Sequence, residues 1–187
     1  MKIKQMVLLS VFFMSSTASA AQFASVIDAM AIKSSDGMTN KGWEDVAKIK
    51  GVKWKWPYHK SGEHDSTMVG VTKVGKDRNP NIGATEVTVS GARTMITAVK
   101  ISIANEPADI QVFGNGKVSK IKTSCDDDSY SNSVGFYKFE KLGYKPLFIS
   151  FQSSWGAGGD SGSVDFEVSY ALDDALGIYP NPCKVLH

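Results

Sequence analysis

The sequence predicts a mainly β protein: an antiparallel β-sandwich or partly closed barrel of about eight strands, with two short N-terminal helices. Three observations lead to this prediction. Short runs of alternating apolar and polar residues recur between residues 52 and 170. Clusters of glycine, asparagine and serine separate many of them at hairpin spacing. No helical pattern alternates with these strands, which argues against a parallel sheet.

The two helices are predicted at residues 22–32 and 42–49. Both segments carry apolar residues three and four positions apart, which is the spacing of one helix face. The second segment has Glu44 and Asp45 in its first turn, where the helix dipole favours acidic groups. Gly51 follows it as a typical C-terminal stop.

The first strand is predicted at residues 52–56, where valine and two tryptophans alternate with two lysines. A second strand is expected at 67–74, followed by a turn-rich loop at 75–83. Three hairpins and a closing strand account for the rest of the pattern. The paired segments are 85–89 with 95–103, 109–113 with 117–123, and 133–139 with 147–153, and the last strand is 164–170.

The chain contains only two cysteines, Cys125 and Cys183. In an exported protein two lone cysteines are expected to pair, because the compartment is oxidising. The resulting disulfide would enclose the three strands predicted at 133–139, 147–153 and 164–170. It would also hold the C-terminal tail, which would otherwise fray.

Residues 1–20 are expected to be a signal peptide. Lys2 and Lys4 precede a short apolar run, and Ala18 and Ala20 provide small residues before the predicted cleavage site. Residues 21–187 are then expected to form a single β-rich domain, periplasmic or secreted. No later segment reaches the roughly 18 apolar residues of a membrane-spanning helix.

Charge is unevenly distributed along the predicted mature chain. Residues 21–122 contain 15 basic and 10 acidic residues, whereas residues 123–187 contain 4 and 9. Nucleic-acid-binding proteins concentrate stronger positive charge, so we expect no nucleic-acid partner. Attraction between the two halves and orientation of a charged partner are both consistent with this distribution.

Aromatic residues are the candidate partner-binding residues. Trp54, Trp56 and Tyr58 lie next to lysines, and Trp155 precedes a glycine-rich loop. On an open face such rings would suit a glycan or a protein interface. Both tryptophans of the first strand, and Trp155, are also consistent with core positions.

Asp126, Asp127 and Asp128 form an acidic run beside the first cysteine. Their carboxylates are suitable Ca²⁺ ligands, although the spacing is not that of a helical calcium loop. A solvated acidic loop is the alternative interpretation. We expect no other cofactor.

No assembled set of catalytic residues is recognisable, so the sequence favours an exported, non-enzymatic binding protein with a protein or glycan partner in the cell envelope. An inhibitor or immunity-type protein that blocks an envelope-targeting enzyme is the specific form we expect. One alternative is a small envelope hydrolase acting on glycan or peptide, with carboxylates such as Glu63, Asp65 and Asp160. The other is a structural or adhesive surface subunit, which would need an unpaired edge strand.

Overall fold

The structure is a computed structural model. The residues it describes are 28, 30–34, 42, 46, 48, 49, 52–55, 66–73, 84–92, 95–105, 107, 108, 110–113, 116–129, 131–159, 161–178 and 183–186.

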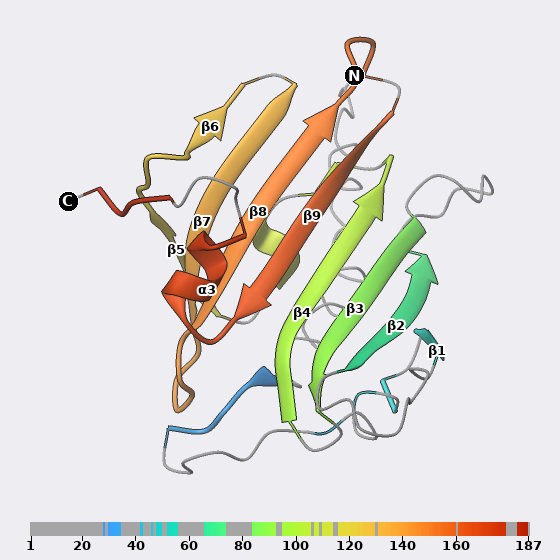
Figure 1. The fold of residues 1–187 in the computed structure, drawn as a ribbon, viewed down its shortest axis with the longest axis vertical. Helices are drawn as coiled ribbons and strands as arrows, with labels where there is room; N and C mark the ends of the chain where they lie inside the picture. Colours follow the sequence, from blue (N-terminus) through green and yellow to red (C-terminus); the bar gives the residue numbers. More distant parts are fainter. Residues whose placement is uncertain are drawn as a thin grey trace, which may run out of the picture.

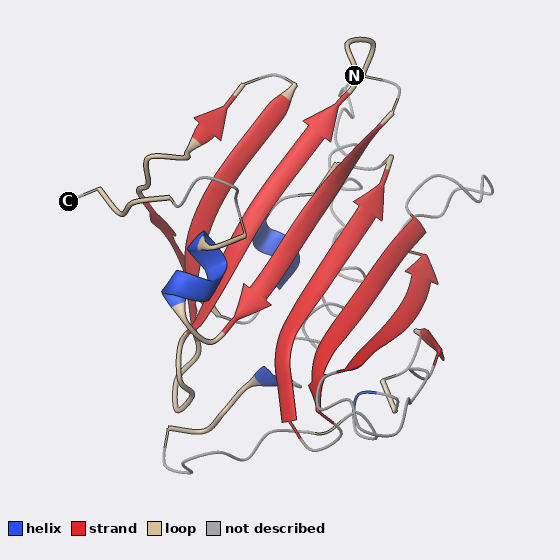
Figure 2. Cartoon of the chain, in the orientation of Figure 1, coloured by secondary structure: helices blue, strands red, loops and turns tan. Residues whose placement is uncertain are grey.

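The described strands form one antiparallel sheet (Figures 1 and 2). Its order is β1-β2-β3-β4-β9-β8-β7-β5, and the short β6 also pairs with β7. The strands are β1 Lys53–Lys55, β2 Ser66–Lys73, β3 Ala84–Ala92, β4 Met95–Ala104, β5 Lys117–Ile121, β6 Asp127–Asp128, β7 Asn132–Glu140, β8 Leu147–Trp155 and β9 Gly162–Ser169. A mainly β, antiparallel protein is therefore confirmed.

The sheet is open, with β1 and β5 as its two ends among the described strands. The predicted sandwich and the predicted barrel are therefore wrong for this part of the chain. A strand pattern specifies which residues share a face, but it does not specify what covers that face. Here the inner face is covered by non-strand segments instead of a second sheet.

The main core lies on this inner face. Cross-strand register places Ile101 of β4 opposite Phe166 of β9 and Val87 of β3, and all three are fully buried. Met30, Val46 and Phe113 pack against them from outside the sheet. The Phe113 and Phe166 rings meet edge to face, with centroids 5.1 Å apart.

Residues 109–113 do not form the predicted strand. Ile110–Phe113 is instead a 3₁₀ helix, η1. Side chains three residues apart share one face of a 3₁₀ helix, so Ile110 and Phe113 both reach the main core. The apolar residues of this short segment therefore indicate a helical turn packed on the sheet, and not a strand.

The two predicted N-terminal helices lie mostly outside the described residues. Asp28, Met30 and Val46 are in helical conformation, which agrees with the predicted positions but does not define either helix. Both helices therefore stay predictions. The only α-helix with described bounds is the five-residue α3, Leu172–Leu176. No helix among the described residues is long and apolar enough to cross a membrane.

The outer face of the sheet is only partly covered. Helix α3 lies in front of the sheet near β7 and β8 in Figure 1, on the side opposite η1. A second apolar cluster forms beneath it, where Phe136, Leu176 and Cys183 are buried. No described element lies in front of β3 and β4 in this view, and the outward-facing Glu86 and Lys100 are exposed.

Candidate binding surface

The most exposed large apolar side chain described in the chain is Leu142, with a relative accessibility of 101%. It lies in the connection between β7 and β8, within the hairpin that the sequence predicted from residues 133–139 and 147–153. The other two exposed large apolar residues described, Leu186 and Ile178, are 53% and 42% exposed. Leu142 therefore projects fully into solvent from the end of a hairpin.

The local backbone explains why Leu142 is at the apex. The Tyr144 amide donates a hydrogen bond to the Lys141 carbonyl at 3.0 Å, which closes a four-residue turn. Gly143 has φ +83°, the value required at the third position of a type II turn. Leu142 therefore occupies the second position of the turn, where its side chain is fully exposed.

The N-terminal segment braces this turn through its backbone. Lys33 forms an antiparallel bridge with Tyr144, the Ser34 amide donates to the Gly143 carbonyl at 2.9 Å, and the Lys145 amide donates to the Ile32 carbonyl at 2.8 Å. In Figure 1 this blue segment passes beside the end of the β7–β8 hairpin. The braced turn, defined as residues 32–34 and 141–145, is thus held by one isolated β-bridge and two flanking backbone hydrogen bonds.

Side-chain contacts strengthen the same unit. The Lys141 ammonium lies 2.7 Å from the Asp28 carboxylate and 5.2 Å from the centre of the Tyr144 ring. Exposed ion pairs contribute little stability, typically below about 1 kcal/mol. These contacts hold the Lys141 side chain in place, and Lys141 is the residue directly before Leu142.

The brace is itself anchored in the core. Met30 is fully buried and Ile32 is 6% exposed. The Tyr170 hydroxyl, just beyond β9, donates a hydrogen bond to the Met30 carbonyl at 2.8 Å. Burial raises the pKa of Tyr170 to about 12, so this donor stays protonated at neutral pH. The turn is therefore tied to the centre of the sheet, not only to its own hairpin.

The described charged residues around the braced turn are mostly lysines. The turn, Asp28 and the adjoining ends of β5 and β7 provide five lysines and two carboxylates, an excess of three positive charges: Lys33, Lys117, Lys138, Lys141, Lys145, Asp28 and Glu140. Both carboxylates are paired, Asp28 with Lys141 and Glu140 with Lys138 at 2.8 Å. The hydrogen bond from Lys138 lowers the pKa of Glu140 below its ordinary value.

The open part of the outer face carries a polar network centred on Asp165 of β9. Its carboxylate accepts hydrogen bonds from the Ser102 hydroxyl at 2.5 Å and from the Ser163 hydroxyl at 3.3 Å. The Lys100 ammonium lies 3.8 Å from the same carboxylate, and its side chain is 52% exposed. These partners come from neighbouring strand positions, as cross-strand pairing on one face dictates.

Glu167 lies two residues from Asp165 and therefore on the same outer face. Register places it opposite Lys100 of β4 and Ser150 of β8. Burial raises the pKa of Glu167, and the neighbouring Lys100 opposes that effect. Two carboxylates in different environments thus share the open face.

The structure describes two of the four aromatic residues that were proposed to bind a partner. Trp54 and Trp155 are half-buried and both pack against the main core, on the inner side of the sheet. The Trp54 indole N–H is buried and has no hydrogen-bond partner among the described residues. Trp56 and Tyr58 lie outside the described residues, so a binding role for all four stays a prediction.

Trp155 is fixed by its cross-strand partner. It pairs with Gly162 of β9, and a Cβ built on that glycine would lie 2.5 Å from a carbon of the indole ring. Glycine is therefore required opposite this tryptophan. Residues 156–159, which follow Trp155, are exposed, whereas the Trp155 ring packs against the main core.

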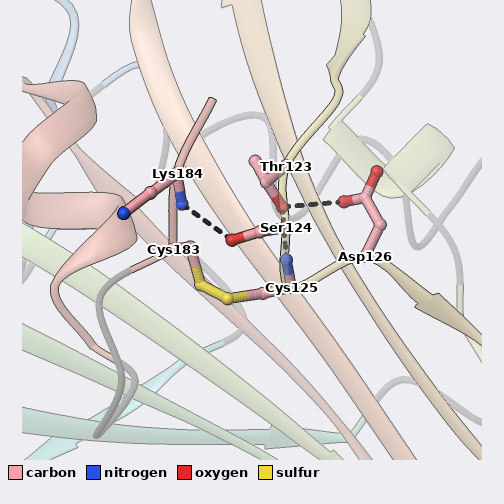
Figure 3. Close-up of a disulfide and its surroundings, with 6 residues drawn as sticks. All are labelled: Thr123, Ser124, Cys125, Asp126, Cys183 and Lys184. Carbon is pink, nitrogen blue, oxygen red and sulfur yellow. Dashed lines mark hydrogen bonds between the residues drawn. A yellow bond between two sulfur atoms is a disulfide. The ribbon is translucent and has the colours of Figure 1, made fainter. Parts of the chain in front are cut away.

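The predicted disulfide is present between Cys125 and Cys183, with Cα atoms 5.4 Å apart (Figure 3). The tail also pairs with the opposite segment through its backbone. The Ser124 amide donates to the Lys184 carbonyl at 2.9 Å, and the Lys184 amide donates to the Ser124 hydroxyl at 3.0 Å. The C-terminal segment is thus fixed by both covalent and hydrogen bonds.

The acidic run divides into different roles. Asp126 accepts a hydrogen bond from Thr123 at 3.1 Å and lies 3.7 Å from the Lys120 ammonium. Asp127 and Asp128 form the exposed β6 instead of the predicted loop. Within the described residues, no three histidine, cysteine or acidic side chains gather around one point. Calcium binding by Asp126, Asp127 and Asp128 stays a prediction.

The sequence identified the hairpin but not the importance of Leu142. The usable signal was a leucine directly before a turn glycine, between two strands whose apolar residues were already accounted for. The suggested hydrolase carboxylates Glu63, Asp65 and Asp160 lie outside the described residues. The alternating pattern of residues 164–170 indicates only that Asp165 and Glu167 share the polar face of a strand.

Comparison with known proteins provides no further assignment: no family model, curated protein or solved structure matches the chain.

Proposed function

We propose that this protein is an exported, non-enzymatic binding protein of the inhibitor or immunity type, which blocks an enzyme that attacks the cell envelope. The observation that supports the proposal is the display of Leu142, fully exposed at the apex of a turn that the rest of the chain braces. A preordered contact residue loses little conformational freedom when it binds, so rigid display favours affinity.

The proposed location rests on two sequence features. The signal-peptide pattern at residues 1–20 is typical of export. The cystine between Cys125 and Cys183 is suited to an oxidising compartment such as the periplasm. An inhibitor in that compartment would meet enzymes that cleave the cell wall.

An inhibition assay tests the proposal. Purified wall-degrading muramidases, amidases and endopeptidases are each incubated with isolated peptidoglycan, with and without the mature protein. We expect near-stoichiometric inhibition of at least one enzyme. Leu142→Ala should weaken that inhibition by at least about tenfold, as expected when a central contact residue is truncated.

Leu186→Ala is the matched control, because it removes the same side chain from an exposed position in the C-terminal tail. It should inhibit as well as the unmodified protein. The proposal is wrong if stoichiometric protein slows none of the enzymes, or if both leucine variants behave alike.

An envelope hydrolase is the second candidate, favoured by the shared face of Asp165 and Glu167. A carboxylate with a raised pKa beside an ion-paired one is a pattern that glycoside-cleaving enzymes use. If this candidate holds, the protein alone releases soluble fragments from peptidoglycan. Glu167→Gln should then abolish the release without unfolding the protein.

A structural or adhesive subunit has less support. The described end strands β1 and β5 each carry two lysines: Lys53, Lys55, Lys117 and Lys120. Lysines on edge strands disfavour the strand-to-strand addition on which such polymers depend. Elution as concentration-dependent oligomers in gel filtration would restore this alternative.

A further inference from the structure

We propose that the braced turn inserts into the substrate cleft of a glycan-cleaving enzyme, with Leu142 in an apolar subsite and the surrounding lysines facing the catalytic carboxylates. This inference rests on the proposed function and names the class of enzyme that is blocked. It follows from three properties of the turn: its shape, its anchoring and its charge.

The shape is that of a narrow projection. The turn between Lys141 and Tyr144 is closed by a single hydrogen bond, so only Leu142 and Gly143 form the apex. A Cβ added to Gly143 would meet no atom within 4 Å, which shows that the space around the apex is open. Such an apex is suited to a concave site, because a flat surface would contact little more than one side chain.

Hydrogen bonds to the N-terminal segment hold the turn in one conformation. Backbone hydrogen bonds of 2.8 to 2.9 Å join Ser34 to Gly143 and Lys145 to Ile32. Ile32 and Met30 are buried in turn. An inhibitor loop that is already ordered loses little freedom on binding, and it does not collapse onto its own surface when the partner is absent.

The charge selects among wall-degrading enzymes. Glycoside hydrolysis uses a pair of carboxyl groups on either side of the scissile bond, so a muramidase cleft carries negative charge. The excess of three positive charges around the turn complements that cleft. A zinc-dependent amidase or endopeptidase presents a metal cation in its cleft instead, which would repel the lysines.

The test uses purified muramidase of the lysozyme type, and binding is measured by surface plasmon resonance at several salt concentrations. We expect Leu142→Ala to raise the dissociation rate at least about tenfold. The double variant Lys33→Glu with Lys145→Glu should lower the association rate about tenfold and weaken its salt dependence. A short chitin oligosaccharide, which occupies the cleft, should compete with the protein.

Two controls separate this inference from a general loss of structure. Leu186→Ala and Lys184→Glu make the same kinds of change in the exposed tail, away from the turn. Both should bind muramidase normally. Far-ultraviolet circular dichroism and thermal unfolding of every variant establish that the sheet is retained.

The outcomes also separate the two proposals. Inhibition of amidases or endopeptidases without inhibition of muramidases would overturn this inference and leave the proposed function intact. Muramidase binding that the oligosaccharide does not affect, or that the lysine variants leave unchanged, would likewise place the turn outside the cleft. Absence of inhibition of every enzyme would overturn the proposed function itself.

Discussion

The two faces of the sheet have apolar clusters of very different size. Among the described residues, the inner core contains fifteen buried side chains from strands, η1 and the N-terminal segment. The outer cluster contains three, Phe136, Leu176 and Cys183. Burial stabilises roughly in proportion to apolar area, so the inner core contributes more stability than the outer cluster.

The disulfide lies at the smaller cluster. Cys183 is one of its buried residues, and Cys125 packs against it. The disulfide thus fixes the C-terminal tail, which has only the small outer cluster to pack against. This difference indicates that the sheet and the tail are stabilised by separate means, which can be tested one at a time.

Removing a ring from the inner core should have the largest effect. Phe166 is fully buried and contacts Phe113 and Phe151, with ring centroids 5.1 and 5.3 Å away. We expect Phe166→Ala to lower the free energy of unfolding by about 3–5 kcal/mol, because it creates a cavity in packed surroundings. Denaturant titration followed by tryptophan fluorescence measures the change.

Phe148→Ala provides the matched control. Phe148 lies on the neighbouring β8 but on the outer face, where it is only half-buried. Its loss should cost clearly less than that of Phe166. Equal losses would contradict the view that the inner face dominates stability.

Removing the disulfide should have the next largest effect. The cysteines are 58 residues apart, and the chain-entropy treatment gives about 4 kcal/mol for a loop of that length. Cys125→Ala with Cys183→Ala should therefore lose about that much free energy of unfolding. Circular dichroism at low denaturant should still report a β-sheet.

Hydrogen exchange locates the consequence of that change. In the alanine pair, the amides of Ser124 and Lys184 should lose protection, because they pair across the bond. The amides of β4 and β9 should stay protected. Uniform loss of protection would mean that the two regions unfold as one.

The smallest expected effect concerns the uncovered part of the outer face. Burial raises the pKa of Glu167, so the folded state favours its neutral form. The associated stability is present below the ordinary pKa of 4.5 and is lost as pH rises through the folded-state value. Glu167→Gln should therefore raise the melting temperature slightly at pH 7 and have little effect at pH 3.

A lower melting temperature for Glu167→Gln at pH 7 would contradict this prediction. It would mean that the Lys100 ammonium stabilises the Glu167 carboxylate by more than burial destabilises it. The open face would then contribute to stability through charge.

The strands between residues 132 and 169 were predictable because their signals are local. Val164, Phe166 and Val168 alternate with polar residues, and this pattern alone specifies the inner face of β9. Residues 109–113 were misassigned because five residues are too few to separate a strand from a 3₁₀ turn. The single open sheet was missed because strand patterns do not encode the partner layer.

The candidate binding surface could likewise be predicted only in part. The hairpin containing Leu142 was readable from its turn residues, but its brace depends on Ile32, Lys33 and Ser34, more than a hundred residues earlier in the chain. No local pattern connects these two segments.

By itself, the sequence determined the strand faces and the pairing of the two cysteines, because alternation acts over short distances and a lone cysteine has only one possible partner. Export stays a prediction. Only the tertiary structure decided that the sheet stays open, that its outer face is half covered, and that one leucine is held rigidly in solvent. Those properties depend on contacts between segments that are far apart in the chain. Such contacts do not appear in the local pattern of apolar and polar residues of either segment.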